Sequence, residues 1–262
     1  MWVFCGGPLS LTIVLYQYHP TRSGKVVQDI LEDYLGYVQS DGYSGYDHLS
    51  RNPDIIHMGC LAHARRKFVE VNKGRKKARG KKKSSKGVAD EALDYIGELY
   101  RIEKYARENE FSFEQIRELR QEKAKPILDQ FKTWLDAHHP LVPPKSLLGK
   151  AIQYTLNQWD RLVVYIQDGF LKPDNNVAEN AIRPFVLGRK NWLFAGAPKG
   201  AEASATFFTL IETAKANGLE PYAYLRYLFE KLPFAQIESD YLKLLPNRVA
   251  MATINEHAAA WA

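Results

Sequence analysis

The first 72 residues alternate between the periodicity of strands and that of helices, and this alternation limits the possible folds more than any other feature. Short β-branched and aromatic runs at residues 2–5 and 11–17 flank a Gly-Gly-Pro sequence, which predicts a hairpin. From Ser23 the apolar residues recur at helical spacing, and Gly36 closes that segment.

A second alternation follows directly. Residues 37–39 form a predicted strand that ends at Ser40-Asp41-Gly42, and a short helix is expected over about 44–50. An apolar run at 55–58 precedes a basic amphipathic helix over 61–72. The order strand, strand, helix, strand, helix, strand, helix predicts a mixed α/β sheet with helices on its faces.

Residues 74–87 contain eight lysines and arginines and few apolar residues. Two interpretations remain open for this run: a solvated, flexible linker or a segment that contacts the DNA backbone. From Asp90 to Gln167 the pattern is helical, with Pro126 in a first turn and Ser146 as a predicted N-cap. We expect the aromatic residues of this stretch to form a helical core.

The sequence after Gly169 predicts further helices. A turn and helix-start pattern at 173–176 predicts a helix over about 175–187, followed by the segment GRKNWLF at 188–194. Helices are also expected near 200–216 and 220–231.

The net charge of +6 is compatible with a polyanionic partner such as DNA. Two cysteines are too few for a disulfide framework in 262 residues, so we expect a reducing, cytoplasmic location. The apolar amino-terminal stretch lacks a basic region and a cleavage site, and no stretch is long enough to span a bilayer. Membrane partners are therefore not expected.

Two carboxylates stand out as possible metal ligands. Asp41 follows a predicted strand, although Asp-Gly in that position by itself indicates a turn. Glu179 lies early in the predicted helix after 173–176, where it could also be a solvated residue paired with Arg183. Phosphodiester chemistry by two divalent ions would give such acidic residues a shared role.

Cys60 and His63, with His57 nearby, form a weaker metal pattern. Three ligands do not complete a tetrahedral zinc site without a fourth. We expect Cys60 to pack in the core and His63 to have a local structural or DNA-facing role.

Several motifs resemble, in order, those of the insertion-sequence-66 transposases. They are QSDGYSGYDHL (39–49), CLAHARRKF (60–68), EALDYIGELYRIE (91–103), KSLLGKAIQYTLNQWDRL (145–162), PDNNVAENAIRPFVLGRKNWLFAG (173–196) and IETAKANGLEPYAYLRYLFEKLP (211–233). The tripeptide DGY by itself is a weak motif, but the long block that contains Glu179 is highly specific. The resemblance covers nearly the whole chain.

The resemblance implies a ribonuclease-H-like catalytic core of the Asp-Asp-Glu type, with a large helical insertion before the Glu. Asp41 would be the second acidic residue and Glu179 the third, both ligands of two Mg²⁺ or Mn²⁺ ions. Arg183 would lie beside the Glu and contact DNA phosphate or orient the carboxylate. DNA contacts are also expected from the following set: Arg65, Arg66, Arg189, Lys190, Asn191 and Trp192. Trp192 could stack on a base or simply pack.

On this basis we expect five regions. Residues 1–72 would begin the catalytic core without its first strand, 73–87 would be a basic linker, 88–167 the helical insertion, 168–197 the second part of the core with the Glu helix, and 198–262 a helical carboxyl-terminal region. The insertion itself is predicted to be entirely helical.

The family's first catalytic Asp lies on the strand before residues 2–4, and the chain begins after it. We therefore expect an amino-terminally truncated, incomplete copy of a DNA transposase that acts on insertion-sequence ends and target DNA. The alternatives are a non-catalytic DNA-binding or assembly module and an inactive remnant. A dimer and accessory proteins of the same element are further expected partners.

Overall fold

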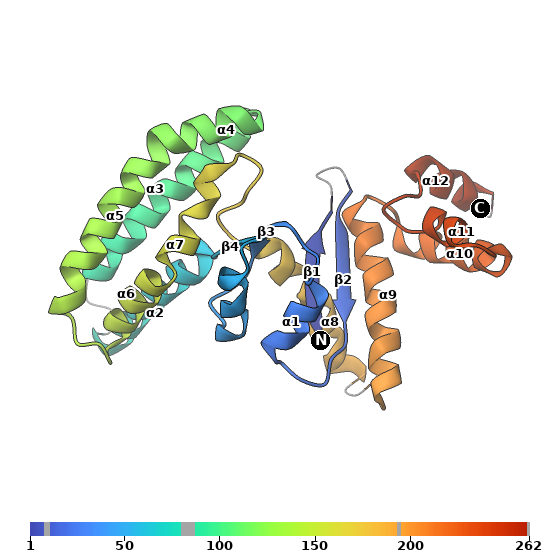
Figure 1. Ribbon diagram of the computed structural model, residues 1–262, viewed down its shortest axis with the longest axis horizontal. Helices are drawn as coiled ribbons and strands as arrows, with labels where there is room; N and C mark the ends of the chain where they lie inside the picture. Colours follow the sequence, from blue (N-terminus) through green and yellow to red (C-terminus); the bar gives the residue numbers. More distant parts are fainter. Residues whose placement is uncertain (8–10, 80–86, 193–194, 261–262) are drawn as a thin grey trace. The chain divides into compact units, whose positions relative to one another are not determined.

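The computed structural model describes residues 1–7, 11–79, 87–192 and 195–260, which form two compact units. Met1–Arg22 and Asn176–Ala262 make up what we call the hairpin unit, and Ser23–Asn175 make up the central unit. Most of the described residues lie in helices, and the remaining regular structure is a set of short strands (Figure 1). The mixed α/β class predicted from the sequence is confirmed, with helix predominating.

In the hairpin unit, β1 (Trp2–Gly6) pairs antiparallel with β2 (Ile13–Gln17), as the Gly-Gly-Pro turn pattern predicts. Along β2 the buried residues Val14 and Tyr16 alternate with exposed neighbours. This period of two is that of a strand with one covered face. The covered face packs on helices α8 (Asn176–Trp192) and α9 (Pro198–Ala216).

Helix α9 also closes the outer edge of β2 with side chains. The hydroxyl of Thr213 accepts a hydrogen bond from the Val14 N–H at 3.0 Å and donates to the Val14 carbonyl at 3.1 Å. The hydroxyl of Thr209 likewise accepts a hydrogen bond from the Tyr16 N–H at 2.9 Å and donates to the Tyr16 carbonyl at 3.4 Å. Since residues four apart share one helix face, a single stripe of α9 satisfies an edge that would otherwise be left without a strand partner.

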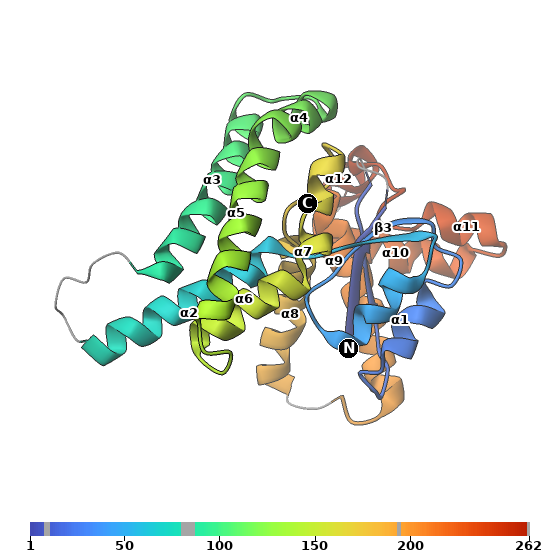
Figure 2. The ribbon, with the colours of Figure 1, turned by 60° about the vertical axis from the view of Figure 1, so that its left-hand side comes forward.

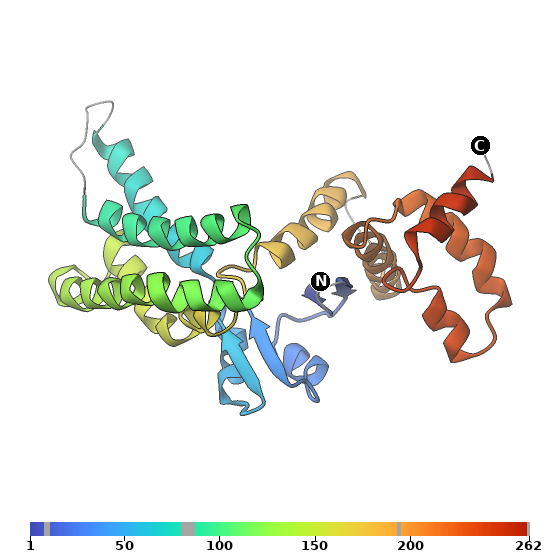
Figure 3. The same ribbon diagram turned by 90° about the horizontal axis from the view of Figure 1, so that it is seen from above.

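The remaining helices of the hairpin unit are short and enclose a small core. They are α10 (Pro221–Lys231), the 3₁₀ turn η5 (Leu232–Phe234), α11 (Glu238–Lys243) and α12 (Met251–Ala259) (Figure 3). Tyr224 and Ile254 are fully buried among them, and the Tyr224 hydroxyl donates to the Leu244 carbonyl at 2.9 Å.

In the central unit, β3 (Gly36–Gln39) pairs in parallel with β4 (Ile55–Met58). Helix α1 (Gly24–Ile30) precedes β3, and the 3₁₀ helix η1 (Ser44–Arg51) connects the two strands. The described strands thus form two separate two-stranded sheets, whereas the sequence predicted one mixed sheet. The strands themselves were placed correctly, but their local patterns carry no information on which strands pair.

The rest of the central unit is a helical bundle of seven elements and its connecting turns. They are α2 (Leu61–Arg79), α3 (Val88–Glu108), α4 (Phe113–Leu119), the π-helical η2 (Arg120–Ala124), α5 (Lys125–His138), α6 (Leu147–Asn157) and α7 (Trp159–Leu162), and the short 3₁₀ turns η3 (His139–Leu141) and η4 (Val164–Gln167) accompany them. Helices α3 and α5 run side by side (Figure 2). Phe68, Ile96, Phe131 and Ile152 are fully buried where α2, α3, α5 and α6 meet.

Local start signals in the bundle agree with the sequence. Pro126 lies in the first turn of α5, and the Ser146 hydroxyl accepts a hydrogen bond from the Gly149 N–H at 3.0 Å as the N-cap of α6. Both predictions are confirmed. The predicted linker at 73–87 differs in part, because α2 continues through Arg79 and residues 80–86 lie outside the described ranges. Lysine and arginine are good helix formers, so a basic run extends a helix readily.

Two other helix ends were misplaced. Helix α1 stops at Ile30 rather than near Gly36, and the hydroxyl of Tyr34 donates to the Tyr37 carbonyl at 3.0 Å instead of joining a helical face. Helix α8 continues through Gly188 to Trp192, where the sequence predicted an end near residue 187. Glycine costs a helix only about 1 kcal/mol, and Arg189 and Lys190 in the last turn complement its dipole.

Candidate functional site

Asp41 lies just beyond the carboxyl end of β3, as predicted. The Ser40 N–H still pairs with the Met58 carbonyl at 3.1 Å, and the chain leaves the sheet at the next residue. Asp41 Oδ1 accepts a hydrogen bond from the Tyr43 N–H at 3.0 Å, which is the turn that Asp-Gly by itself indicates. Within the described part of the chain, Oδ2 has no such partner, so the turn leaves half of the carboxylate for a ligand.

A buried histidine supports the loop that carries Asp41. The Ser40 hydroxyl donates to the Asp41 carbonyl at 2.9 Å, so its oxygen accepts from Nε2 of His57, 2.7 Å away. Nδ1 of His57 then accepts from the Ser50 hydroxyl at 2.8 Å, an assignment that follows from the roles each group can play. Burial, with the positive charge of Arg161, lowers the pKa of His57 to about 4, so the ring is neutral near pH 7.

Tyr154 of α6 packs against the same loop. A Cβ atom at Gly42 would lie 2.6 Å from the Tyr154 ring, so only glycine fits there without a shift of the ring. The ammonium of Lys67 lies over the Tyr154 ring, 5.5 Å from its centroid. Burial, with smaller contributions from Cys60 and Asp41, raises the pKa of Tyr154 to about 12, so its hydroxyl stays protonated.

Helix α2 presents a basic face next to this tyrosine. Arg65, Arg66 and Lys67 are exposed, whereas Ala64 and Phe68 are buried in the bundle. The helix is therefore fixed by its apolar side, and the two arginines predicted to contact DNA are accessible on the other side.

The segment that leads to the Glu helix is anchored at the carboxyl end of β3. The Gln39 amide donates to the Lys172 carbonyl at 2.9 Å, and the Tyr100 hydroxyl donates to Asp174 Oδ2 at 3.1 Å. The Asn175 N–H lies 3.5 Å from Sγ of Cys60. Sequence reasoning missed Tyr100, because a tyrosine in a helical stripe indicates core packing and nothing more.

Cys60 is buried, as predicted, and that burial raises the pKa of its thiol above the ordinary value. His57 uses both ring nitrogens for Ser40 and Ser50, which removes it from any metal site with Cys60. His63 lies in the first turn of α2, and its predicted DNA-facing role remains a prediction.

Arg120 fixes the turns just before this anchored segment. Its guanidinium is 2% exposed and pairs with Glu103 at 2.7 Å. It also donates to the carbonyls of Tyr165 and Leu171, each at 2.8 Å. The run RQEKAK at 120–125 has the composition of a solvated charged face, so nothing in the sequence indicates a buried arginine.

Glu179 lies in the first turn of α8, in the hairpin unit, as predicted. Ala181, Ile182 and Phe185 pack against the hairpin, and the Tyr16 hydroxyl donates to the Ala181 carbonyl. Pro184 lies within the helix and removes one backbone donor there.

The basic residues of α8 follow Glu179 in the same continuous helix. Arg183 and Lys190 are four and eleven residues beyond Glu179, so helical spacing puts all three on one stripe. Arg183, Arg189, Lys190 and Asn191 are exposed. The side chain of Trp192 lies outside the described part of the structure, so its predicted role stays open.

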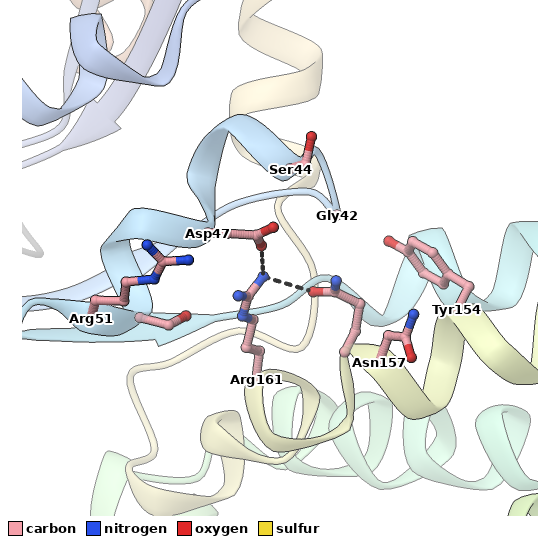
Figure 4. A pocket seen from close by; sticks show the side chains of 9 residues that line it. Gly42, Ser44, Asp47, Arg51, Tyr154, Asn157 and Arg161 are labelled. Carbon is pink, nitrogen blue, oxygen red and sulfur yellow. Dashed lines mark hydrogen bonds and ion pairs between the residues drawn. The ribbon is translucent and has the colours of Figure 1, made fainter.

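A pocket of about 550 Å³ lies beside the Asp41 loop. Its lining residues are Gly42, Ser44, Asp47, Ser50, Arg51, Tyr154, Asn157, Gln158 and Arg161. Figure 4 shows Tyr154, Asn157 and Arg161 extending from the helices toward Gly42 and toward η1, which carries Ser44 and Asp47. An Arg161 nitrogen lies 2.9 Å from Asp47 Oδ1 and 3.3 Å from Gln158 Oε1.

In the described ranges, no helix combines the length and the apolar character that crossing a bilayer requires.

The chain is similar in sequence to several known proteins. The uncharacterized protein y4hP of Sinorhizobium fredii is 33% identical over 250 residues, which cover 92% of this chain and 45% of that protein. The uncharacterized protein y4jD of the same organism is 34% identical over 223 residues, 83% of this chain and 42% of that protein. The chain thus spans less than half the length of these relatives. No solved structure matches it significantly.

Two family profiles cover most of the chain. Residues 1–203 match the family described as Transposase IS66, and residues 209–247 match the IS66 C-terminal element. The motifs that carry the resemblance in the sequence lie within these two matches. The chain belongs to the IS66 transposase family.

Proposed function

We propose that this chain is the catalytic region of a DNA transposase and that Asp41 and Glu179 bind divalent metal ions in DNA cleavage and strand transfer. Family membership supports a transposase role. The observation that carries the residue assignment is the anchoring of 172–175 beside the end of β3, directly before the helix of Glu179.

The covalent chain supports bringing the two carboxylates into one site. Glu179 follows the anchored Asn175 by four residues, and four extended residues span at most about 14 Å. This short connection allows the Glu179 carboxylate to reach the part of the central unit where Asp41 lies.

A ribonuclease-H-like core is part of the proposal. An antiparallel hairpin, a helix, and then a parallel strand pair with an acidic residue at the strand end are compatible with it. The family resemblance assigns the first catalytic Asp to a strand before β1. The activity proposed here is thus that of the longer family proteins, which this chain represents in part.

The donor atoms suit Mg²⁺ or Mn²⁺, because both carboxylates offer the oxygen ligands that these ions prefer. Two such ions, when bound, activate the attacking oxygen and stabilise the leaving one. The residues of the chain have the remaining tasks. Asp41 and Glu179 hold the ions, and Arg183 contacts a DNA phosphate or orients the Glu179 carboxylate.

In this proposal water first cleaves a phosphodiester bond at an element end, leaving a 3′-hydroxyl. That hydroxyl then attacks the phosphorus of a phosphodiester in the target DNA. The bond from this phosphorus to the 3′-oxygen of the target strand breaks, and that oxygen leaves. Because two element ends react together, we propose a dimer, with accessory proteins of the same element as further partners.

A second candidate function is a DNA-binding or assembly module that does not cleave. The exposed basic residues of α2 and α8 favour it, because phosphate binding by Arg65, Arg66, Arg189 and Lys190 requires no metal. Such binding would weaken steeply with salt.

Two measurements separate these functions. Mn²⁺ binding to the chain is measured by titration calorimetry, and nicking of supercoiled plasmid is measured with Mg²⁺ or Mn²⁺ present. The catalytic proposal predicts that Asp41→Asn and Glu179→Gln each weaken Mn²⁺ binding by this chain and abolish nicking by the protein extended to include the first catalytic Asp, while the control Glu118→Gln changes neither. Salt-sensitive DNA binding without nicking would leave the non-catalytic module as the function of this chain. Unchanged Mn²⁺ binding in both variants would overturn the metal assignment.

A further inference from the structure

We propose that the pocket between η1 and helices α6 and α7 binds a backbone phosphate of the DNA strand, next to the phosphate that reacts at Asp41. This inference rests on the proposed function, because it deepens the same site. It gives the helical segment that contributes Tyr154, Asn157 and Arg161 a direct part in holding the DNA strand.

The pocket is continuous with the Asp41 loop. Gly42 and Ser44, one and three residues after Asp41, line it, and the Asx turn of Asp41 fixes the course of these residues. Ser50 lines the pocket and, through His57, connects to Ser40 beside Asp41. A strand with one phosphate at Asp41 would thus pass the pocket with its next phosphate.

The charges of the lining favour an anion. Arg51 and Arg161 contribute two positive charges and Asp47 one negative charge, so the pocket carries one net positive charge. Asp47 is held by Arg161 at 2.9 Å, which offsets its repulsion of a phosphate. Phosphate oxygens need hydrogen-bond donors as well as charge.

The neutral lining residues supply such donors. Ser44 offers a hydroxyl, and Tyr154 keeps its proton at neutral pH. Asn157 accepts from the Gln153 amide through Oδ1 at 2.6 Å, so its own NH₂ group remains a donor for the pocket.

Arg161 also has a structural explanation, and Arg51 does not. The Arg161 side chain is 17% exposed and ties α7 to η1 through Asp47, while its carbonyl accepts from the Gly59 N–H at 2.9 Å. Arg51 is exposed and forms no ion pair within the part of the chain that the structure describes. A contact with a bound phosphate would explain why Arg51 lines this polar pocket.

The surroundings favour a nucleic acid strand over a small anion. Lys67 lies over the ring of Tyr154, and Arg66 is exposed on the same helix. Basic groups therefore continue from the pocket along α2. A repeating polyanion can use such a track, whereas a single phosphate cannot.

The test measures DNA affinity of the 262-residue chain against salt concentration, by fluorescence anisotropy with a short labelled single strand and its duplex. We expect Arg51→Gln to weaken binding about threefold to tenfold and to reduce the slope of log K against log salt by about 0.7–0.9, one phosphate contact. Arg101→Gln, an equal charge change on exposed α3, is expected to bind as the unchanged chain does.

A second variant adds charge without changing shape. Asn157→Asp keeps the acceptor for Gln153 and introduces a carboxylate into the pocket, so we expect weaker binding than for Gln130→Glu on exposed α5. If both pocket variants bind DNA as their controls do, the pocket proposal is wrong and the transposase proposal stands. If the unchanged chain does not bind DNA, the pocket proposal falls as well, and the nicking assay decides the function.

A third outcome identifies a small-anion site. Inorganic phosphate is added in a thermal unfolding experiment to the unchanged chain and to Arg51→Gln. Stabilisation that depends on Arg51, combined with DNA affinity that does not, would overturn the assignment to a DNA strand.

Discussion

Nε2 of His57 lies 2.7 Å from the hydroxyl of Ser40, the residue before Asp41, and Nδ1 of the same ring lies 2.8 Å from the hydroxyl of Ser50. Ser50, on the other side of the ring, lines the pocket. A single buried ring therefore joins the loop of the predicted metal ligand to the predicted phosphate site.

This histidine makes stability depend on pH. Its pKa is lowered from 6.5 to about 4 in the folded chain, so between these values the unfolded chain binds more protons. Stability from this group is present above pH 6.5 and decreases as the pH falls toward 4, by about 3 kcal/mol at most. Urea unfolding at pH 7, 6 and 5 should show this decrease, and His57→Gln should reduce it. His139→Gln, at an exposed position, should keep the full decrease; equal slopes in both variants would contradict the assignment.

Arg120 should be the most sensitive charged residue of the central unit. Arg120→Met leaves the Glu103 carboxylate and three backbone carbonyls without their donor, so we expect a loss of about 3–5 kcal/mol. Arg120→Lys should not restore it, because an ammonium cannot reproduce the planar fork. Thermal unfolding measures the change.

The control for Arg120 is Arg117→Met. Arg117 is 44% exposed and pairs with the exposed Glu114 in the adjacent turn, so its replacement should leave the free energy of unfolding nearly unchanged. A small effect at both positions would show that the buried guanidinium is dispensable.

Gly42→Ala should force the Tyr154 ring away from the Asp41 loop. The added methyl would lie 2.6 Å from the ring, and overpacking of this kind costs about 1–3 kcal/mol. Gly97→Ala in the middle of α3, where a methyl meets nothing within 4 Å, should instead stabilise the chain by about 0.5–1 kcal/mol. Chemical denaturation of the two variants tests both signs, and combining Gly42→Ala with Tyr154→Ala should give a non-additive result.

Thr213→Val should destabilise the hairpin unit. The change keeps the shape of the side chain but leaves the N–H and carbonyl of Val14 without their partner, which costs about 1–3 kcal/mol. Thr213→Ser keeps the hydroxyl and should lose less. Thr206→Val, on the exposed side of α9, should be close to neutral in the same unfolding assay. Equal losses at Thr206 and Thr213 would argue against the edge contacts.

The sequence predicted best what depends on neighbouring residues. The strands at 2–6, 13–17, 36–39 and 55–58 and the position of Asp41 after a strand follow from alternation and turn residues alone. The N-cap at Ser146 was predictable for the same reason. Helix ends were harder. Gly188 suggested an end, but glycine costs a helix only about 1 kcal/mol, and the basic residues after it complement the helix dipole.

Contacts between distant segments could not be predicted. Tyr154 and Arg161 reach the loop of Asp41 from more than a hundred residues away, and their own surroundings in the sequence indicate only an amphipathic helix. The burial of Arg120 is of the same kind, since a charged run normally lies in solvent. Which residues complete a site depends on tertiary packing, and periodicity does not record it.

The threonine stripe of α9 determines on which side of the hairpin a further strand can pair. Because Thr209 and Thr213 occupy the backbone groups along the outer edge of β2, a newly arriving strand cannot dock there. A further strand would therefore have to pair on the β1 side, whether it belongs to a longer polypeptide, to a second molecule or to an aggregate. The hairpin thus behaves as a one-sided template, and any sheet built on it extends away from α9.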